Sequence, residues 1–260
     1  MNIGIFGLGE AGALIAADLA SEGCRVMAFD PADVDTPARV KRVEEPHRLA
    51  ASSDLIVALT AGQDAPGALD QALSSISPDT VYADFSTNSV EAKEAMAAVA
   101  RENGFAFVDI ALMSIVPGKG LKTPMLASGT GAQKLLSLCS SLPVSIEVVS
   151  DIAGDASRRK LLRSIMMKGL AATIIEALRA AEEVGMKKWL WQNIANELEQ
   201  ADASTIRRFV EGSDKHATRR IHEMEASCAL LKDLNIEPLM ASATVETLQH
   251  VKKHGVPGIN

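Results

Sequence analysis

The first thirty residues constrain the fold more than any other part of the chain. Residues 1–6 predict a short buried strand, and the run Gly7–Leu8–Gly9–Glu10–Ala11–Gly12 follows it directly. Residues 13–22 are rich in alanine and predict a helix, and residues 25–29 predict a second strand that ends at Asp30. A G-x-G-x-x-G between strand and helix, with an acidic residue after the next strand, is the signature of a dinucleotide-binding site.

Each glycine of this motif has a separate task at such a site. Gly7 permits the tight turn off the strand, Gly9 lets the backbone approach a pyrophosphate, and Gly12 lets the helix pack close to the strand. The backbone amides at the start of the helix favour an anion. We therefore expect the whole motif to bind the cofactor: Gly7, Leu8, Gly9, Glu10, Ala11 and Gly12.

Asp30 bears on the choice of cofactor. Its carboxylate can accept hydrogen bonds from a ribose diol and would repel a 2′-phosphate, which favours NAD. Arg39, Lys41 and Arg42 follow closely and can compensate for a 2′-phosphate, so NADP stays possible. Thr60, at the end of an apolar run, is a further candidate cofactor residue. The alternative to a dinucleotide-binding site at residues 7–12 is a glycine turn that merely joins a strand to a helix.

Composition excludes several classes of protein. The chain has 260 residues, of which 47% are hydrophobic and 23% charged, as in ordinary soluble proteins. A net charge of −7, with no basic stripe, argues against nucleic-acid binding. No apolar run reaches membrane-spanning length, and we expect no signal peptide before the first strand. The three cysteines are far apart and fit a reducing compartment, so we expect a cytoplasmic protein.

The first part of the chain alternates between strands and helices. After residues 25–29 the predicted strands are 54–59, 80–83, 106–108, 124–127 and 146–149; the predicted helices after the first are 65–76, 89–103 and 132–140. Ser89 is the expected N-cap of its helix. Such alternation predicts an α/β, Rossmann-type doubly wound parallel sheet. We place this dinucleotide-binding domain at residues 1–152.

The second part, residues 153–260, shows only helical patterns. The predicted helices are 156–184, 187–199, 203–210, 216–234 and 238–254. The first would contain about 29 residues and span about 44 Å, so we expect it to connect the two domains. An all-helical domain of this kind has little core of its own, which favours a homodimer formed through these helices.

Lys160 is the strongest candidate for chemistry. On a helix it shares a face with Ser164 and Lys168, among apolar neighbours. A lysine beside such a surface and near a positively charged ring can act as a general acid or base. The alternative is a surface lysine whose stem covers apolar groups.

An ordered set of segments resembles the β-hydroxyacid dehydrogenase and 6-phosphogluconate dehydrogenase superfamily over essentially the whole chain. The matching segments are residues 7–12, 84–87, 109–129 and 154–160. Residues 109–113, 116–124 and 216–224 resemble one branch more closely, which carries a 6-phosphogluconate-dehydrogenase-like carboxy-terminal domain of unassigned function.

The resemblance implies roles for individual residues. Lys160 would be the catalytic lysine, Ser86 and Thr87 would lie near the nicotinamide or its ribose, and residues 109–114 would begin the substrate loop. Two positions depart from the family pattern: Met113 stands where a serine is usual, with Ser114 next, and Ser164 stands where an asparagine is usual. The predicted substrate residues are Met113, Ser114, Lys119 and Lys168, the lysines as ligands for a carboxylate or phosphate.

The resemblance and the motif together predict an NAD(P)-dependent oxidoreductase. It would transfer hydride between nicotinamide and a CH–OH or C=O carbon of a small acidic metabolite. Two alternatives are a dinucleotide-binding protein without turnover and an imine reductase, which acts on a C=N bond. No metal is expected, because the sequence offers no evident third ligand beside the His250 and His254 pair.

Overall fold

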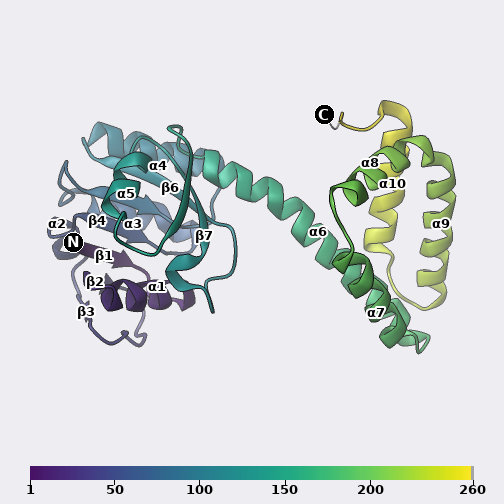
Figure 1. Ribbon diagram of the computed structural model, residues 1–260, viewed down its shortest axis with the longest axis horizontal. Helices are drawn as coiled ribbons and strands as arrows, with labels where there is room; N and C mark the ends of the chain where they lie inside the picture. Colours follow the sequence, from purple (N-terminus) through teal and green to yellow (C-terminus); the bar gives the residue numbers. More distant parts are fainter. Residues whose placement is uncertain (259–260) are drawn as a thin grey trace. The chain divides into compact units, whose positions relative to one another are not determined.

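The computed structural model describes residues 1–258 and divides into two compact units. The first runs from Met1 to Arg163 and the second begins at Ser164. The long helix α6 (Asp155–Glu183) starts in the first unit and continues into the second (Figure 1). A domain boundary at residue 152 stays a prediction. The last two residues of the predicted helical domain, 259 and 260, lie outside the described part.

An eight-stranded sheet forms the centre of the first unit, in the order β3-β2-β1-β4-β5-β6-β7-β8. The strands are β1 (Asn2–Phe6), β2 (Arg25–Phe29), β3 (Val40–Arg42), β4 (Leu55–Ala58), β5 (Val81–Asp84), β6 (Ala106–Leu112), β7 (Pro124–Ser128) and β8 (Ser145–Ser150). The Rossmann-type α/β fold is thereby confirmed.

One part of the sheet departs from the expected parallel arrangement. Strands β1 to β6 are parallel, but β7 runs antiparallel to β6, and β8 is parallel to β7. A parallel pair needs a long crossover, usually a helix, whereas β6 and β7 are joined by a loop with one short 3₁₀ turn (Gly120–Lys122). The loop therefore returns the chain in the opposite direction.

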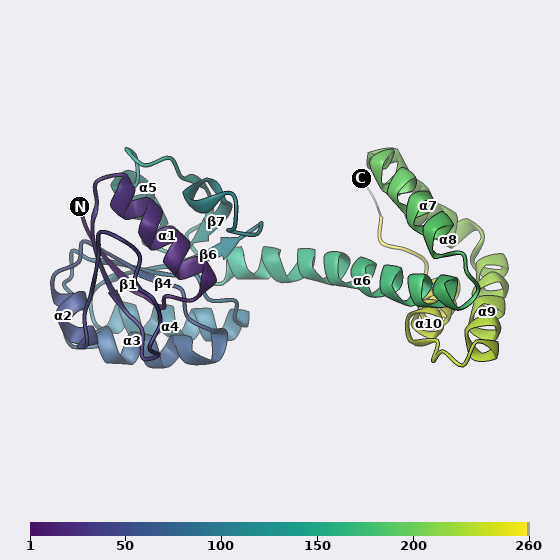
Figure 2. The same ribbon diagram turned by 90° about the horizontal axis from the view of Figure 1, so that it is seen from below.

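Helices cover both faces of the sheet, as Figure 2 shows. On one face lie α1 (Glu10–Ser21) and α5 (Ala132–Leu138); on the other lie α2 (Pro46–Ala51), α3 (Ala65–Leu73) and α4 (Val90–Glu102). Each face has its own apolar core. Ile15, Leu19 and Leu135 belong to the first core. Leu49, Leu69 and Met96 belong to the second.

Several predicted boundaries shift in the structure. The strand expected to end at Val108 continues to Leu112, so Asp109 lies inside β6. A charged residue usually ends a buried strand, because a buried charge without partners is costly. Here the strand continues, because Lys93 and Ser157 pair with the Asp109 carboxylate. Helix α3 ends at Leu73 rather than at residue 76. The predicted N-cap is confirmed, because the Ser89 side chain accepts a hydrogen bond from the amide of Ala92.

The second unit is helical, as predicted. After α6 come α7 (Lys187–Glu199), α8 (Ala203–Lys215), α9 (Ala217–Asp233) and α10 (Leu239–His254). Asp202 caps α8 in a capping box with Thr205. Helix α8 extends past the predicted end at Val210, because Gly212 is tolerated inside it. Among the helices of residues 1–258, none has the length and apolarity to span a membrane.

Candidate functional site

The glycine motif forms the turn between β1 and α1. Gly7 has a φ of +94°, and a Cβ there would lie 2.6 Å from the carbonyl oxygen of Leu59. A Cβ on Gly12 would lie 2.1 Å from the carbonyl oxygen of Gly7, so only glycine permits this packing. At Gly9, by contrast, a Cβ would meet no atom within 4 Å. The turn is therefore tight on the protein side and open where a ligand would approach.

A hollow of about 280 Å³ lies beside this turn. Its lining includes Gly7, Gly9, Phe29, Asp30 and Thr60. The hydroxyl of Thr60 is buried and has no hydrogen-bond partner within the described residues, although buried polar groups are normally paired. Helix α1 begins here without a side-chain cap, which leaves its first amides available to an anion. These groups fit a dinucleotide.

Asp30 is held in place at the edge of this hollow. Its Oδ2 accepts a hydrogen bond from the amide of Leu8 (2.7 Å), and its Oδ1 accepts one from the amide of Ala32 (2.8 Å). Each carboxylate oxygen can accept further bonds, so the residue keeps its capacity for a ribose diol. Arg42 donates to the carbonyl oxygens of Val34 (2.5 Å), Asp30 (3.0 Å) and Ala32, so its guanidinium holds the loop after β2.

Lys160 and Thr87 meet in the first unit. The Nζ of Lys160, on α6, donates a hydrogen bond to the Oγ1 of Thr87 at 2.8 Å. Thr87 follows β5 and is exposed, and Lys160 is half-buried. Two residues that the sequence predicted for one site, far apart in the chain, are therefore in contact at the carboxyl end of a parallel strand, where ligands of such sheets bind.

Beneath this pair lies a buried ionic cluster that the sequence did not predict. Asp84, Lys93 and Asp109 are all completely buried. The Nζ of Lys93, on α4, lies 2.7 Å from Asp84 Oδ2 and 3.1 Å from Asp109 Oδ1. In the sequence Lys93 resembles any surface lysine of an amphipathic helix. The only signal was the presence of two aspartates at the ends of neighbouring strands.

Asp109 also holds the beginning of α6. It accepts hydrogen bonds from the Ser157 hydroxyl (2.7 Å) and from the Ser157 amide (2.9 Å). The amide of Ala156 donates to the hydroxyl of Ser128 (3.0 Å), on β7. Two amides of the first helical turn are thus capped by side chains from the sheet, which fixes where the helix starts.

The remaining predicted residues lie in different surroundings. Ser86 is buried, and its hydroxyl donates to Asp84 (2.8 Å). In the loop between β6 and β7, the amide of Met113 donates to the carbonyl oxygen of Pro124 (2.8 Å). Lys119 Nζ donates to the Ser114 hydroxyl (2.7 Å); Lys119 is exposed and Ser114 is half-buried. The predicted substrate loop therefore contains one lysine–serine pair.

Ser164 and Lys168 belong to the second unit, further along α6. Their spacing from Lys160 places them on the same helical face, and their roles stay predictions. Within residues 1–258, no group of three acidic, histidine or cysteine side chains is arranged to hold a metal ion.

Comparison with known proteins assigns both parts of the chain. Residues 2–115 match the family "NAD binding domain of 6-phosphogluconate dehydrogenase". A domain of unknown function, DUF1932, matches residues 181–251. The prediction of a nicotinamide dinucleotide cofactor and of an uncharacterised carboxy-terminal domain is thereby confirmed.

Relatives agree with this assignment. The chain is 31% identical to 2-(hydroxymethyl)glutarate dehydrogenase of Eubacterium barkeri over 209 residues, which cover 75% of this chain and 68% of that protein. It is 29% identical over 147 residues to an uncharacterised 28.5 kDa protein of Methanothermus fervidus; this match covers 56% of the chain and 57% of that protein.

A solved structure shares the fold. The imine reductase of Myxococcus stipitatus in complex with NADP⁺ superposes with a TM-score of 0.81 at 16% identity, covering 98% of this chain and 96% of that chain. The similarity to 2-(hydroxymethyl)glutarate dehydrogenase, together with the matched NAD-binding domain, shows that the chain belongs to the β-hydroxyacid dehydrogenase and 6-phosphogluconate dehydrogenase superfamily.

Proposed function

We propose that this protein is an NAD(P)-dependent oxidoreductase that interconverts a CH–OH and a C=O group on a small acidic metabolite. The observation that carries the proposal is the contact between Lys160 and Thr87 at the carboxyl end of β5. This contact supports the proposal because the primary amine of Lys160 lies at the carboxyl ends of the parallel strands, and the dinucleotide motif follows the carboxyl end of β1.

The chain's own groups have distinct tasks in this reaction. A bound nicotinamide dinucleotide supplies the hydride acceptor or donor. Lys160 takes the hydroxyl proton when the carbon is oxidised and returns a proton to the carbonyl oxygen when it is reduced. The turn of residues 7–12 and the amides of α1 hold the pyrophosphate. Thr87 orients the amine of Lys160 through the bond between them.

The substrate is proposed to carry a carboxylate or phosphate. The exposed ammonium of Lys119, held by Ser114, offers a ligand for an anion in the substrate loop. Lys168 is a second candidate. The name of the E. barkeri relative makes 2-(hydroxymethyl)glutarate the first compound to test.

NAD is the preferred cofactor in this proposal. The Asp30 carboxylate lies at the edge of the hollow and would repel a 2′-phosphate. Arg42, which could have compensated, donates instead to backbone carbonyl oxygens of the loop after β2. A lower Kd for NAD than for NADP in calorimetry would agree with this choice.

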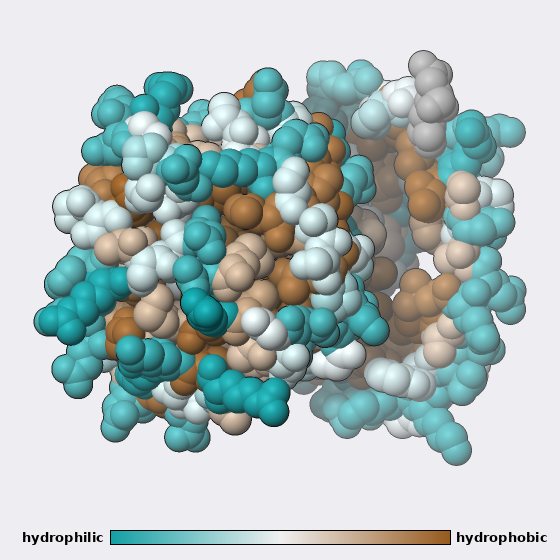
Figure 3. Space-filling model, turned by 60° about the vertical axis from the view of Figure 1, so that its left-hand side comes forward, coloured by the Kyte–Doolittle hydropathy of each residue, from teal (hydrophilic) through white to brown (hydrophobic). Residues whose placement is uncertain are grey.

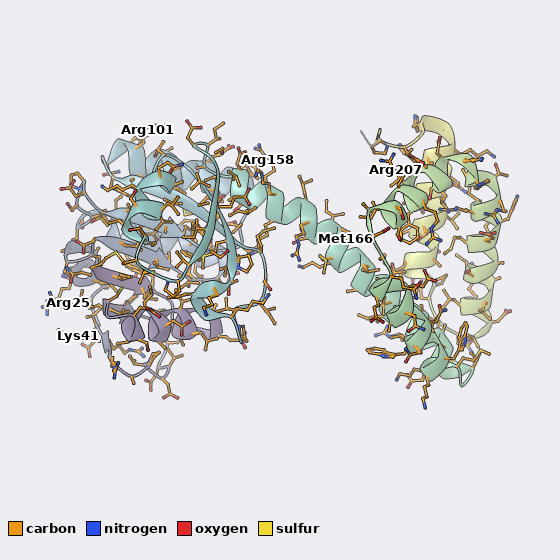
Figure 4. All side chains as sticks on the ribbon, in the orientation of Figure 1. Arg25, Lys41, Arg101, Arg158, Met166 and Arg207 are labelled. Carbon is orange, nitrogen blue, oxygen red and sulfur yellow. The ribbon has the colours of Figure 1, made fainter. Side chains whose placement is uncertain are left out.

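A homodimer formed through the helices of the second part completes the proposal. On α6, Leu162 is 62% exposed, Ile165 73% and Met166 58% (Met166 is labelled in Figure 4). In the second unit, apolar side chains reach the surface (Figure 3), and an apolar hollow of about 510 Å³ includes Trp189 and Leu231 in its lining. Exposed apolar surface of this kind marks interfaces. Light scattering should give twice the chain mass; a monomer would contradict the dimer.

The cytoplasm is the proposed compartment. All three cysteines are free, in agreement with a reducing environment. A fluorescent fusion or cell fractionation would test this assignment.

Absorbance of the reduced nicotinamide tests the activity. The panel consists of 2-(hydroxymethyl)glutarate, other hydroxy acids, the matching oxo acids and cyclic imines, each with NAD(H) and NADP(H). Turnover of a hydroxy acid or its oxo acid supports the proposal. Turnover of imines alone would favour the imine reductase alternative, and cofactor binding without any turnover would favour a non-catalytic dinucleotide-binding protein.

A further inference from the structure

We propose that Lys93 is a positioning residue for Lys160. Its buried ammonium joins the turn that carries Thr87 to the start of the helix that carries Lys160. This inference rests on the proposed function, because the catalytic task of Lys160 is what makes its position matter.

The buried ammonium of Lys93 makes two hydrogen bonds and two ion-pair contacts with two aspartates. It donates to the backbone carbonyl oxygen of Asp84 (3.1 Å) and to the Oδ2 of the same residue (2.7 Å). Its third partner is Asp109 Oδ1 at 3.1 Å. A buried ion cluster of this kind is costly to desolvate, and apolar side chains of similar volume often give equal stability. The cluster therefore points to a requirement for defined geometry.

The first arm of the cluster leads to Thr87. The carboxylate of Asp84 accepts hydrogen bonds from the amide of Ser86 (3.1 Å) and from its hydroxyl (2.8 Å). Ser86 is buried, so these bonds fix the backbone immediately before Thr87. The exposed Thr87 side chain then projects from a turn that Lys93 holds through Asp84.

The second arm leads to Lys160. Asp109 binds both the amide and the hydroxyl of Ser157, in the first turn of α6. Lys160 follows three residues later and so lies on nearly the same side of the helix. Any shift of the Asp109 carboxylate would move this first turn and the lysine with it.

The two arms close on each other at the proposed site. Lys160 and Thr87 are 2.8 Å apart, and the path between them below the surface runs through Ser157, Asp109, Lys93, Asp84 and Ser86. The backbones of the two arms pair directly at Asp84 and Asp109, and the Lys93 ammonium contacts both of their carboxylates. The predicted effect of Lys93 is on the placement of the Lys160 amine, and misplacement by about 1 Å can cost about a hundredfold in rate.

Four variants of the full-length protein test this inference. Ser157→Ala removes one hydroxyl of the second arm, and Ser157→Thr retains it. Lys93→Met removes the bridging charge. Ser53→Ala is the matched control, because Ser53 is also a buried serine, and its hydroxyl donates to the carbonyl oxygen of Leu49 (2.7 Å) at the amino-terminal end of β4.

Three readouts separate positioning from a general loss of stability. They are kcat and KM with the active panel compound, the ¹³C signal of Lys160 in protein labelled at the lysine ε-carbons and assigned with Lys160→Arg, and hydrogen exchange of the amides of residues 86–87 and 157–161. The Kd for NAD, measured by calorimetry, serves as the check on the cofactor site.

Ser157→Ala should lower kcat by about ten- to a hundredfold, with KM and the Kd for NAD within about twofold. It should shift the Lys160 signal and speed exchange at residues 157–161 only. Lys93→Met should speed exchange in both segments. Ser157→Thr should restore most of kcat, and Ser53→Ala should leave kcat and the Lys160 signal unchanged despite a comparable loss of Tm.

Equal behaviour of Ser157→Ala and Ser53→Ala in kcat and in the Lys160 signal would overturn the inference. If Lys93→Met does not fold, Lys93→Arg, which keeps the charge but not its geometry, replaces it, and a Lys160 signal unchanged from the wild type in that variant would equally overturn the inference. If the wild type turns over no panel compound, the proposed function fails, while the Lys160 signal and the exchange rates still decide whether the cluster positions that amine.

Discussion

Asp109 accepts hydrogen bonds from both the amide and the hydroxyl of Ser157, 48 residues further along the chain. A carboxylate buried inside a central strand therefore caps the first turn of the helix that carries Lys160. The same carboxylate is a partner of the Lys93 ammonium. This arrangement predicts a large effect of Asp109 on stability.

Replacing Asp109 by alanine should destabilise the protein by about 3–5 kcal/mol, because it leaves a buried ammonium without one of its partners. Chemical denaturation measures the change. The control is Asp79→Ala, an exposed aspartate in a turn, which should stay within about 0.5 kcal/mol of the wild type. Similar values for the two variants would contradict the account of the buried cluster.

Tyr82→Phe should leave the protein equally stable or make it more stable by about 1 kcal/mol. The Tyr82 ring stacks on Phe107 (6.1 Å between centroids), but its buried hydroxyl has no hydrogen-bond partner among the described residues. Burial, followed by the charges of Asp84 and Asp70, raises the pKa of this phenol well above its usual value. It is the single tyrosine of the chain, so tyrosinate absorbance should develop only when alkali unfolds the protein. Reversible titration near pH 10 in the folded state would disagree.

Glu176→Ala should destabilise the second unit by about 1–2 kcal/mol. The Glu176 carboxylate, on α6, accepts hydrogen bonds from the amides of Met240 and Ala241 (both 2.8 Å) and so caps the start of α10. Glu176→Gln keeps one amide oxygen as acceptor and should lose less. Thermal unfolding of both variants measures the difference. An equal loss of stability in the two variants would show that the negative charge of Glu176 does not contribute to the cap.

Stability should fall in alkali partly through Cys139. Burial raises the pKa of its thiol from 9.0 to about 11. The unfolded chain releases this proton more readily than the folded protein does. The neutral, buried thiol therefore contributes its full share of the free energy of unfolding below pH 9, and this share is lost as the pH rises from 9 to 11. Wild-type protein should therefore lose more free energy of unfolding between pH 8 and pH 10.5 than Cys139→Ala. Parallel curves for the two proteins would exclude this linkage.

The sequence predicted those features that depend on local pattern. The glycine turn, most strands, the Ser89 cap and the end of α7 at Glu199 follow from neighbouring residues. Strand β3 and helix α2 were missed, because three- and six-residue elements carry almost no periodicity. The direction of β7 depends on its long-range pairing with β6.

The candidate site likewise contains residues that the sequence predicted and a residue that only the folded structure reveals. Lys160 and Thr87 were predicted through segments that resemble a family, and the structure brings them together. Lys93 was missed, because a lysine in a helix with several charged neighbours gives no sign that it is buried. Its burial follows from two aspartates in strands that become neighbours only after folding.

The most direct test of the central claim compares the wild type with Lys160→Ala on the active panel compound, following the absorbance of the reduced nicotinamide. Lys134→Ala, an exposed lysine on α5, is the matched control. We expect Lys160→Ala to lose about 10²- to 10⁴-fold in kcat while its Kd for NAD stays near the wild-type value, and Lys134→Ala to keep full activity. Equal kcat values for wild type and Lys160→Ala would remove this lysine from the chemistry and contradict the proposed mechanism.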